Sequence, residues 1–391
     1  MGRLFSVLSL MLLLFQINTV AQTPSLSESS TISLLTCGSG EELYSSFGHT
    51  AFRVQDPALG IDVVYNYGTF DFNKPNFYLN FAKGKLIYSL SRTSFERFLY
   101  EYELEKRWVR EQIFDLNLAE RNRILAFLEN NYKPENRDYA YDPLLNNCSS
   151  ITGDILIDQF NGSIEFKESH LKKQYSFRQL VRQYLSYNSW SAFGIDLAFG
   201  SVVDRVATVR EHMFMPYYAM YQLRNTTKRG KPLVKRERVI LDYAELEDNS
   251  FFPLSPLFWF SLLFVFICVI TYLDRSHKAR SRWLDFSIFL VTGLVGTILL
   301  ILWLATDHTS TPYNYNVLWA MPFNLVFAFI LLAEPRFSTW MSKYLLLLLG
   351  LMALVILLWI VGVQSFSPVL IPLFLALGVR YLYLLKISKL P

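Results

Sequence analysis

Residues 255–273 read SPLFWFSLLFVFICVITYL, and this stretch separates two parts of the chain that differ in character. It contains no charged residue, and its length is close to the roughly 20 residues that a helix needs to cross a bilayer. Charged side chains are frequent before residue 250, whereas long apolar runs dominate after it. The sequence therefore predicts a soluble domain followed by a membrane domain.

The composition supports this division and excludes several classes of protein. Over 391 residues the chain is 52% hydrophobic and 18% charged, whereas soluble domains contain about 25% charged residues. A net charge of +4 gives no support to nucleic-acid binding. Three cysteines are too few for a disulfide scaffold, and the five histidines lack the spacing of a zinc site. We therefore expect no metal and no cofactor.

Residues 1–21 have the features of a signal peptide. Arg3 supplies a positive flank, residues 7–15 form a short apolar core, and residues 19–21 (TVA) resemble a cleavage site. The apolar core is too short to cross a bilayer. An uncleaved amphipathic start is the alternative. We expect an exported domain over residues 22–253.

Residues 254–391 form the expected membrane domain. Five stretches in it are apolar and long enough to span, at about 255–273, 284–304, 317–333, 344–363 and 368–386. The first and third connections and the C-terminal end are cationic; they contain Arg275, Lys278, Arg280, Arg282, Arg336, Lys343, Arg380, Lys386 and Lys389. The second and fourth connections, residues 305–316 and 364–367, contain no Lys or Arg. Because cytoplasmic loops are rich in Lys and Arg, the C-terminus is expected in the cytoplasm and residues 22–253 outside it.

The exported domain is long enough for one compact core, and its pattern is that of an α+β fold. Short β-like segments occur at 50–54, 62–67 and 85–91, and helical periodicity occurs at 94–106, 117–131 and 149–160. We expect a small antiparallel sheet with helices packed against it.

Cys148 and His49 are the candidate catalytic pair. Cys148 opens the helix that begins after NN at 146–147, and a helix N-terminus lowers the pKa of a thiol and offers free N–H groups to an oxyanion. His49 lies at the entrance to the first β-like segment, directly after Gly48. An imidazole that takes the proton of a thiol allows the thiolate to attack a carbonyl carbon. This pair predicts acyl-transfer chemistry.

A third residue would orient His49, and two candidates are open. Asn66 lies on the next β-like segment, a hairpin away, and Asp71 follows it. Two non-catalytic alternatives are also open. His49 could be only structural, and Cys148 could form a disulfide with Cys37, since both cysteines are expected on the oxidising side of the membrane.

A second polar constellation lies in the connection that lacks positive charge. Asp307, His308, Asn314 and Asn316 gather there beside Trp319, at the expected outer boundary of the membrane. Anchoring at the interface would account for Trp319, but four further polar residues exceed what anchoring requires. We expect these residues to bind substrate.

Taken together, these motifs resemble those of the Lnb-type lipoprotein N-acyltransferases. The resemblance rests on LLTCGSGEELYSSFGHTAFRV at 34–54, NNCSS at 146–150, EHMFMP at 211–216 and DHTSTPYNYNVLWAMP at 307–322. It extends over nearly the whole mature chain and includes the arrangement of an exported domain before a membrane domain. The family usually has a proline where this chain has Ser39, a difference in a turn that affects no candidate catalytic residue.

The resemblance implies a fold, a reaction and a location. The exported domain is similar to circularly permuted papain-like (NlpC/P60-type) enzymes, with Cys148 as nucleophile and His49 as base. A fatty acyl chain would pass from a phospholipid, through a thioester on Cys148, to the α-amine of a diacylglyceryl-cysteine on a lipoprotein. The location would be the bacterial inner membrane with the exported domain in the periplasm. Arg53 and Asn147, inside the quoted motifs, are expected to bind substrate.

Two alternative functions use the same residues differently. A membrane-tethered peptidoglycan amidase or endopeptidase would also employ Cys148 and His49, although one membrane anchor would suffice for it. A non-catalytic envelope protein would contain Cys148 and Cys37 as a structural disulfide.

Overall fold

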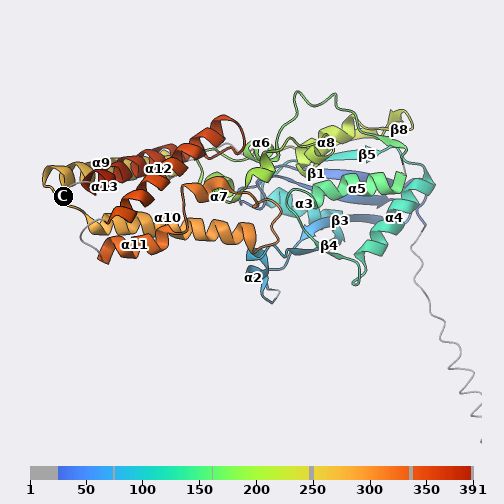
Figure 1. Cartoon of the computed structure of the whole chain (residues 1–391). Coiled ribbons are helices and arrows are strands. Elements are labelled where there is room, and N and C mark those ends of the chain that lie inside the picture. Colours follow the sequence, from blue (N-terminus) through green and yellow to red (C-terminus); the bar gives the residue numbers. More distant parts are fainter. Residues whose placement is uncertain (1–24, 74, 161, 246–250, 334–337, 389–391) are drawn as a thin grey trace, which may run out of the picture.

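An antiparallel sheet of seven strands forms the centre of the N-terminal part of the chain (Figure 1). The computed structural model describes residues 25–73, 75–160, 162–245, 251–333 and 338–388. The strands follow the order β10-β5-β1-β2-β3-β4-β6 across the sheet. Their bounds are β1 Thr31–Cys37, β2 His49–Asp56, β3 Ile61–Thr69, β4 Ile87–Ser94, β5 Val109–Phe114, β6 Asp138–Ala140 and β10 Val234–Leu241.

Helices cover both faces of this sheet because side chains alternate along the strands. Leu34 and Phe52 belong to a core that includes residues of α4 (Leu118–Tyr132) and α5 (Cys148–Phe160). Leu35 and Ala51, one position along on each strand, belong to a second core with Phe98 of α3 (Phe95–Leu104). The site described below lies where α5 begins beside the ends of β2 and β3.

The expected sheet with helices against it is confirmed, but the sheet is larger than the sequence indicated. The predicted segments at 50–54, 62–67 and 85–91 lie in or overlap β2, β3 and β4, and the three predicted helices correspond to α3, α4 and α5. The segments that form β1, β5, β6 and β10 were not predicted as strands. Strands β1 and β5 are buried on both faces, so they lack the alternation of polar and apolar residues that marks a half-exposed strand.

Shorter elements complete the N-terminal part. The helices are α2 Phe77–Ala82, α6 Phe177–Arg182, α7 Trp190–Ala198 and α8 Pro216–Arg224, with 3-10 turns η1 Ser201–Asp204 and η2 Glu211–Phe214. A small second sheet contains β7 Ile164–Glu165, β8 Thr227–Lys228 and β9 Lys231–Pro232. Figure 1 shows α6 and α7 between the large sheet and the C-terminal helices.

The C-terminal part is a bundle of helices. Its elements are η3 Phe252–Leu254, α9 Pro256–Ser276, α10 Arg282–Leu304, η4 Tyr315–Leu318, α11 Asn324–Ala333, α12 Thr339–Ile360, η5 Pro368–Leu370 and α13 Ile371–Ile387. Within the described residues, four helical stretches are long and apolar enough to cross a membrane. They correspond to the first, second, fourth and fifth predicted spans. The predicted signal peptide, residues 1–21, lies outside the described residues.

The third predicted span, 317–333, is wrong as a continuous helix. The chain forms η4, passes Pro322, and becomes α-helical only from Asn324, so α11 contains 10 residues and is about 15 Å long. Proline lacks the N–H that a continuing helix needs. The break packs closely on α10, where a Cβ atom on Gly296 would lie 1.5 Å from the carbonyl oxygen of Ala320.

Buried charges join three of the membrane helices at the end of the bundle that is far from the sheet. Arg380 of α13 is fully buried and donates to Asp285 of α10 at 2.6 Å and to Asp274 of α9 at 2.8 Å. Arg280 contacts the second oxygen of Asp285 at 2.8 Å. Both carboxylates are thereby neutralised inside the bundle.

Replacing Arg380 with leucine should strongly destabilise the protein. The change leaves Asp274 and Asp285 buried without their main partner, and breaking a buried pair in this way costs about 3–5 kcal/mol. Thermal unfolding of the detergent-solubilised protein measures the loss. The control is Arg275→Leu, because Arg275 is an exposed arginine of the same helix as Asp274. Equal stability of the two variants would contradict the structural role of Arg380.

Candidate active site

Cys148 is the first residue of α5, and the side chain of Asn147 caps this helix. Oδ1 of Asn147 accepts hydrogen bonds from the backbone N–H groups of Ser149 and Ser150, at 2.8 and 2.9 Å. Nδ2 of Asn147 donates to the carbonyl oxygen of Pro143 in the preceding turn, at 2.8 Å, and to that of Phe214 in η2, at 2.9 Å. Because Asn147 is held from both sides, Cys148 is fixed at the positive end of the helix.

His49 and Asn66 come from neighbouring strands of the sheet. His49 is the first residue of β2, and Phe52 of the same strand pairs with Tyr65 of β3. Continuing this register places Asn66 diagonally across from His49 on the same face. Nε2 of His49 and Oδ1 of Asn66 are 2.6 Å apart. Since an amide oxygen only accepts, Nε2 carries the proton and Nδ1 is left for the thiol.

The thiol of Cys148 and the imidazole of His49 are half-buried, and each favours the charged form of the other. Burial disfavours charge on Cys148, but attraction to His49 and hydrogen bonds with His49 and Thr50 outweigh it, so the pKa of the thiol is lowered. Burial also opposes charge on His49, yet Cys148 and Asn66 raise the pKa of its imidazole above the usual value. Both shifts favour a thiolate beside an imidazolium, which is a nucleophile together with its proton donor.

Two further residues shape this site, and the sequence analysis missed both. The Thr50 hydroxyl donates to the carbonyl oxygen of Cys148 at 3.0 Å and ties β2 to the first turn of α5. Gly68 has a φ of 94° and stands at an irregularity between β3 and β4. A Cβ atom there would lie 3.8 Å from Cβ of Cys148 and 3.9 Å from Cε1 of His49. Position 68 thus needs glycine for its backbone conformation, directly beside the catalytic candidates.

In the structure, Asp71 does not orient His49, and Cys37 does not form a disulfide with Cys148. Asp71 is exposed and accepts a hydrogen bond from the N–H of Asn73 at 2.9 Å, in a turn of its own. Cys37 and Cys148 are both free thiols, so the alternative of a disulfide between them is wrong. Cys37 is fully buried in the core on the α3 side of the sheet, and burial raises the pKa of its thiol to about 12.

Comparison with known families covers most of the chain. The family model of the Lnb N-terminal periplasmic domain matches residues 22–185, which include His49, Asn66 and Cys148. The family model of the Lnb transmembrane domain matches residues 247–390. The chain belongs to the Lnb family. No curated protein and no solved structure gave a match.

Within the Lnb periplasmic domain, Arg53 and Asn147 have structural partners instead of open substrate positions. The Arg53 guanidinium contacts Asp62 at 2.7 Å and Glu111 at 3.0 Å, and it lies 3.4 Å from the ring centre of Phe95. The Arg53 side chain is buried, and Arg53 follows His49 by four residues in β2. Asn147 uses its amide in the helix cap. The structure therefore does not bring either side chain to the cysteine as a free ligand.

The loop of the Lnb transmembrane domain that contains Asn314 and Asn316 is a joint between the two parts of the chain. Nδ2 of Asn314 donates to the carbonyl oxygens of Leu197 and Ala198 in α7, at 2.8 and 3.0 Å. Nδ2 of Asn316 donates to Oδ1 of Asn314, and its Oδ1 accepts from the indole of Trp319 at 2.8 Å. All three loop side chains are buried. In the structure these side chains hold the two parts of the chain together, and their predicted role in substrate binding stays a prediction.

Asp307 and His308 lie on the side of this loop that faces α2. The N–H of Asp307 donates to the carbonyl oxygen of Lys83 at 2.9 Å. Asp307 is exposed and His308 is half-buried, and neither side chain makes a hydrogen bond or ion pair with the described residues. Their expected role in binding substrate stays a prediction.

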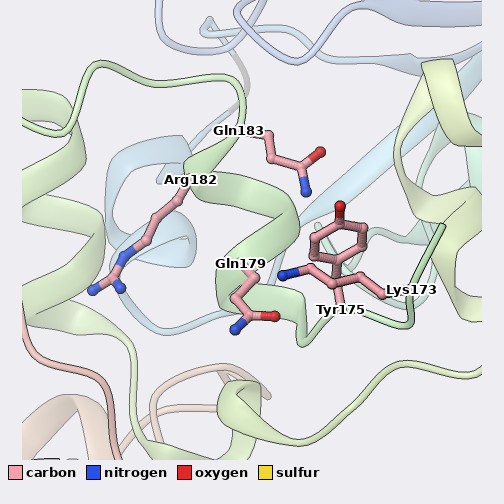
Figure 2. Close-up of a pocket in the computed structure, with 5 residues that line it drawn as sticks. All are labelled: Lys173, Tyr175, Gln179, Arg182 and Gln183. Carbon is pink, nitrogen blue, oxygen red and sulfur yellow. The ribbon is translucent and has the colours of Figure 1, made fainter.

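A shallow pocket of about 250 Å³ lies away from Cys148, on α6 (Figure 2). It is lined by Lys173, Tyr175, Gln179, Arg182 and Gln183. Figure 2 shows the Arg182 guanidinium directed away from Tyr175. That group contacts Asp196 at 2.9 Å and the carbonyl oxygen of Phe366 in the membrane domain at 3.1 Å. Arg182 therefore belongs to the joint between the domains.

Among the described residues, no group of three or more His, Cys, Asp or Glu side chains is placed to hold a metal ion.

Alkylation by iodoacetamide should detect the lowered pKa of Cys148. In the wild type, the midpoint of the rate against pH should lie below the ordinary thiol value of about 8.5, because thiolate persists as pH falls. In His49→Ala the midpoint should rise above the wild-type value, since the attraction that favours thiolate is lost while burial remains. Cys37 should contribute no signal near neutral pH because its pKa is about 12. An unchanged midpoint in His49→Ala would contradict the ion pair.

Asn66→Ala should weaken the site without abolishing it. The substitution removes one hydrogen bond to a charged imidazole, which is worth about 1.5–3 kcal/mol. A loss of this size corresponds to a rate that is roughly 10- to 100-fold lower. We expect a lower rate of Cys148 acylation by p-nitrophenyl acetate, with little change in the ester concentration that gives half-maximal rate. Asn66→Gln, which keeps the amide on a longer side chain, should recover part of the loss. A normal rate in Asn66→Ala would show that Asn66 does not position His49.

Proposed function

We propose that the protein is a lipoprotein N-acyltransferase with Cys148 as nucleophile. The observation that carries the proposal is the hydrogen-bonded set of Cys148, His49 and Asn66, in a chain that continues into an Lnb transmembrane domain. The thiol belongs to the helix end, and its base belongs to the sheet. The donor is a membrane phospholipid, and the acceptor is a lipoprotein with a diacylglyceryl-cysteine at its N-terminus.

In the first half-reaction, the Cys148 thiolate attacks an ester carbonyl of the phospholipid. The backbone N–H of Cys148 can support the resulting oxyanion, because the next two N–H groups are already used by Asn147. As the C–O bond breaks, the imidazolium of His49 gives its proton to the leaving alkoxide. The products are a lysophospholipid and an acyl thioester on Cys148.

In the second half-reaction, the α-amine of the lipoprotein cysteine attacks the thioester. His49, now neutral, takes a proton from the amine while the C–S bond breaks and the thiolate is restored. Asn66 holds the imidazole in one tautomer through both halves, so Nδ1 always faces the reacting atoms. Two lipid substrates held in one membrane plane meet at high effective concentration, which explains why the site is attached to a membrane domain.

The order of the site residues supports the permuted papain-like fold for the periplasmic domain. The base His49 precedes the nucleophile Cys148 in the chain, and Cys148 opens a helix that packs on the strand containing His49. Asn66, on the next strand, takes the orienting position. The same three side-chain types in the same roles would serve an amide hydrolase or an acyltransferase.

Contacts at the two ends of the bundle support a cytoplasmic C-terminus. Asn316 meets Leu197 of the periplasmic domain at 3.3 Å, whereas the Leu331 carbonyl oxygen accepts from Arg280 at the opposite end at 2.8 Å. The broken segment between them therefore crosses the same distance as α10. Together with the four long helices, this segment gives five crossings of the membrane. The cationic end of the bundle near Arg280 then faces the cytoplasm.

The acyltransferase explains more of the structure than a peptidoglycan hydrolase does. A wall polymer lies outside the bilayer, and an enzyme that cleaves it has no need of a site joined to several membrane helices. Here the joint around Asn314 fixes the periplasmic domain to the bundle through buried hydrogen bonds. Such a fixed attachment suits substrates that both lie in the membrane.

The wild-type protein incubated with phospholipid vesicles should gain a fatty-acyl mass on the Cys148 peptide, and neutral hydroxylamine should remove it. Cys148→Ala should show no adduct and no transfer to a diacylglyceryl lipopeptide. His49→Ala should form the adduct about 10²–10⁴-fold more slowly. The matched control is Cys268→Ala, which removes a free thiol from α9 and should behave as wild type. Normal lipopeptide acylation by Cys148→Ala would end the proposal. Cleavage of a muropeptide bond without any acyl adduct would favour the hydrolase.

A further inference from the structure

An exposed aromatic cluster surrounds α2. We call Phe70, Phe72, Phe77, Tyr78 and Phe81 the α2 cluster. Phe72 lies 4.8 Å from Phe70 and 5.1 Å from Phe77, measured between ring centres. Phe72, Tyr78 and Phe81 are 53%, 74% and 50% exposed. No residue of α2 is buried, so this helix contributes little to the core of its own domain.

The α2 cluster lies at the outer end of a membrane helix. α10 ends at Leu304, and three residues later the N–H of Asp307 donates to the Lys83 carbonyl oxygen at 2.9 Å. Gly84 follows with a φ of 76°, and a Cβ atom there would lie 2.5 Å from the backbone nitrogen of His308. Figure 1 shows α2 beside this end of α10. The cluster is therefore held at the level where the bilayer meets water.

The chemistry of α2 fits the headgroup region of a membrane. Aromatic side chains concentrate at this depth, because their rings are apolar and the tyrosine hydroxyl can meet water. Lys83 and Lys85 are exposed directly after the helix, where their ammonium groups can meet lipid phosphates. Phe77, Phe81 and Ile87 line a pocket of about 190 Å³ together with Lys85. A surface that combines aromatic rings, a small apolar pocket and two lysines suits a phospholipid better than a soluble protein.

A continuous series of aromatic rings leads from the α2 cluster to the nucleophile. Phe70 lies 5.1 Å from Tyr88, and Tyr88 stacks on Tyr141 at 4.2 Å with an angle of 18° between the rings. A backbone bridge between Asp142 and Asn146, at 3.0 and 3.1 Å, brings the chain after Tyr141 back to the start of α5, two residues before Cys148. Burial and the charge of Cys148 raise the pKa of the Tyr141 phenol well above the usual value. An acyl chain that follows these rings therefore stays on an apolar path from the membrane surface to the thiol.

We propose that α2 lies in the outer leaflet and that the aromatic series Phe72–Phe70–Tyr88–Tyr141 guides one acyl chain of the donor phospholipid to Cys148. This inference rests on the proposed acyltransferase function for its substrate. The ester of the donor would leave the leaflet beside Lys83 and Lys85, which retain its phosphate near the membrane. The path also accounts for Asp307 and His308 of the membrane domain, which lie beside it.

The depth of α2 can be measured without any catalysis. Spin labels are attached at Leu79→Cys or Leu59→Cys in a Cys148→Ser, Cys268→Ala protein, in nanodiscs of phosphatidylethanolamine and phosphatidylglycerol. Leu79 of α2 and Leu59 of the β2–β3 turn are similarly exposed, at 52% and 48%, but Leu59 lies at the far end of β2 from His49. The Leu79 label should be accessible to oxygen and protected from a water-soluble nickel relaxant, and the Leu59 label should show the reverse. A Leu79 label that behaves as the Leu59 label does would overturn the inference.

The path itself is tested with two esters. Phe72→Ser/Phe81→Ser should acylate Cys148 from phospholipid vesicles at least tenfold more slowly than wild type, and the rate with water-soluble p-nitrophenyl acetate should be unchanged. Leu59→Ser is the control and should react normally with both esters. Normal acylation from vesicles by the double variant would overturn the path, and equal losses with both esters would show a folding defect that refutes a specific role in lipid delivery. If the wild type forms no acyl-enzyme from phospholipid, the proposed function fails, while the Leu79 label still decides whether α2 lies in the leaflet.

Discussion

The hydrogen bonds of Asn147 determine where the nucleophile lies. Its amide oxygen caps α5, and its amide nitrogen donates to carbonyl oxygens of the preceding turn and of η2. Thr50 adds a bond from β2 to the Cys148 carbonyl group. Cys148 and His49 are 99 positions apart in the chain, so nothing local brings the thiol and the imidazole together. The cap and the Thr50 bond provide that constraint, and the ion pair between Cys148 and His49 follows from it.

A second constraint is the joint between the two parts of the chain. Buried amide groups of Asn314 and Asn316 bond to α7, and the backbone of residues 307–313 meets α2 and η1. Close approach requires glycine at position 200, where a Cβ atom would lie 1.7 Å from the Pro312 carbonyl oxygen. Because the joint uses backbone and buried side chains together, it fixes the position of Cys148 relative to the helix bundle. For the proposed acyltransferase, a nucleophile at a fixed distance from the bundle can meet lipids that remain in their leaflet.

The catalytic candidates were predictable because their signals are local. A cysteine that opens a helix, preceded in the chain by a histidine at a strand entrance, is visible in one sequence. The choice between Asn66 and Asp71 was not visible, because it depends on the register of β2 against β3 and on the turn that occupies Asp71. Arg53 and the loop asparagines show a different difficulty. A polar residue near a motif has the same appearance in sequence whether its partner is a substrate or another part of the protein.

The sequence by itself determined the division into an exported and a membrane part, the four long membrane helices and the Cys148–His49 pair, because hydrophobic length and residue chemistry are properties of short segments. Only the tertiary structure decided that the third apolar segment is broken at Pro322, that Arg380 is neutralised inside the bundle and that α2 lies beside the end of α10. These features depend on contacts between segments far apart in the chain. Such contacts form only when the whole chain has folded, so no short stretch of sequence records them.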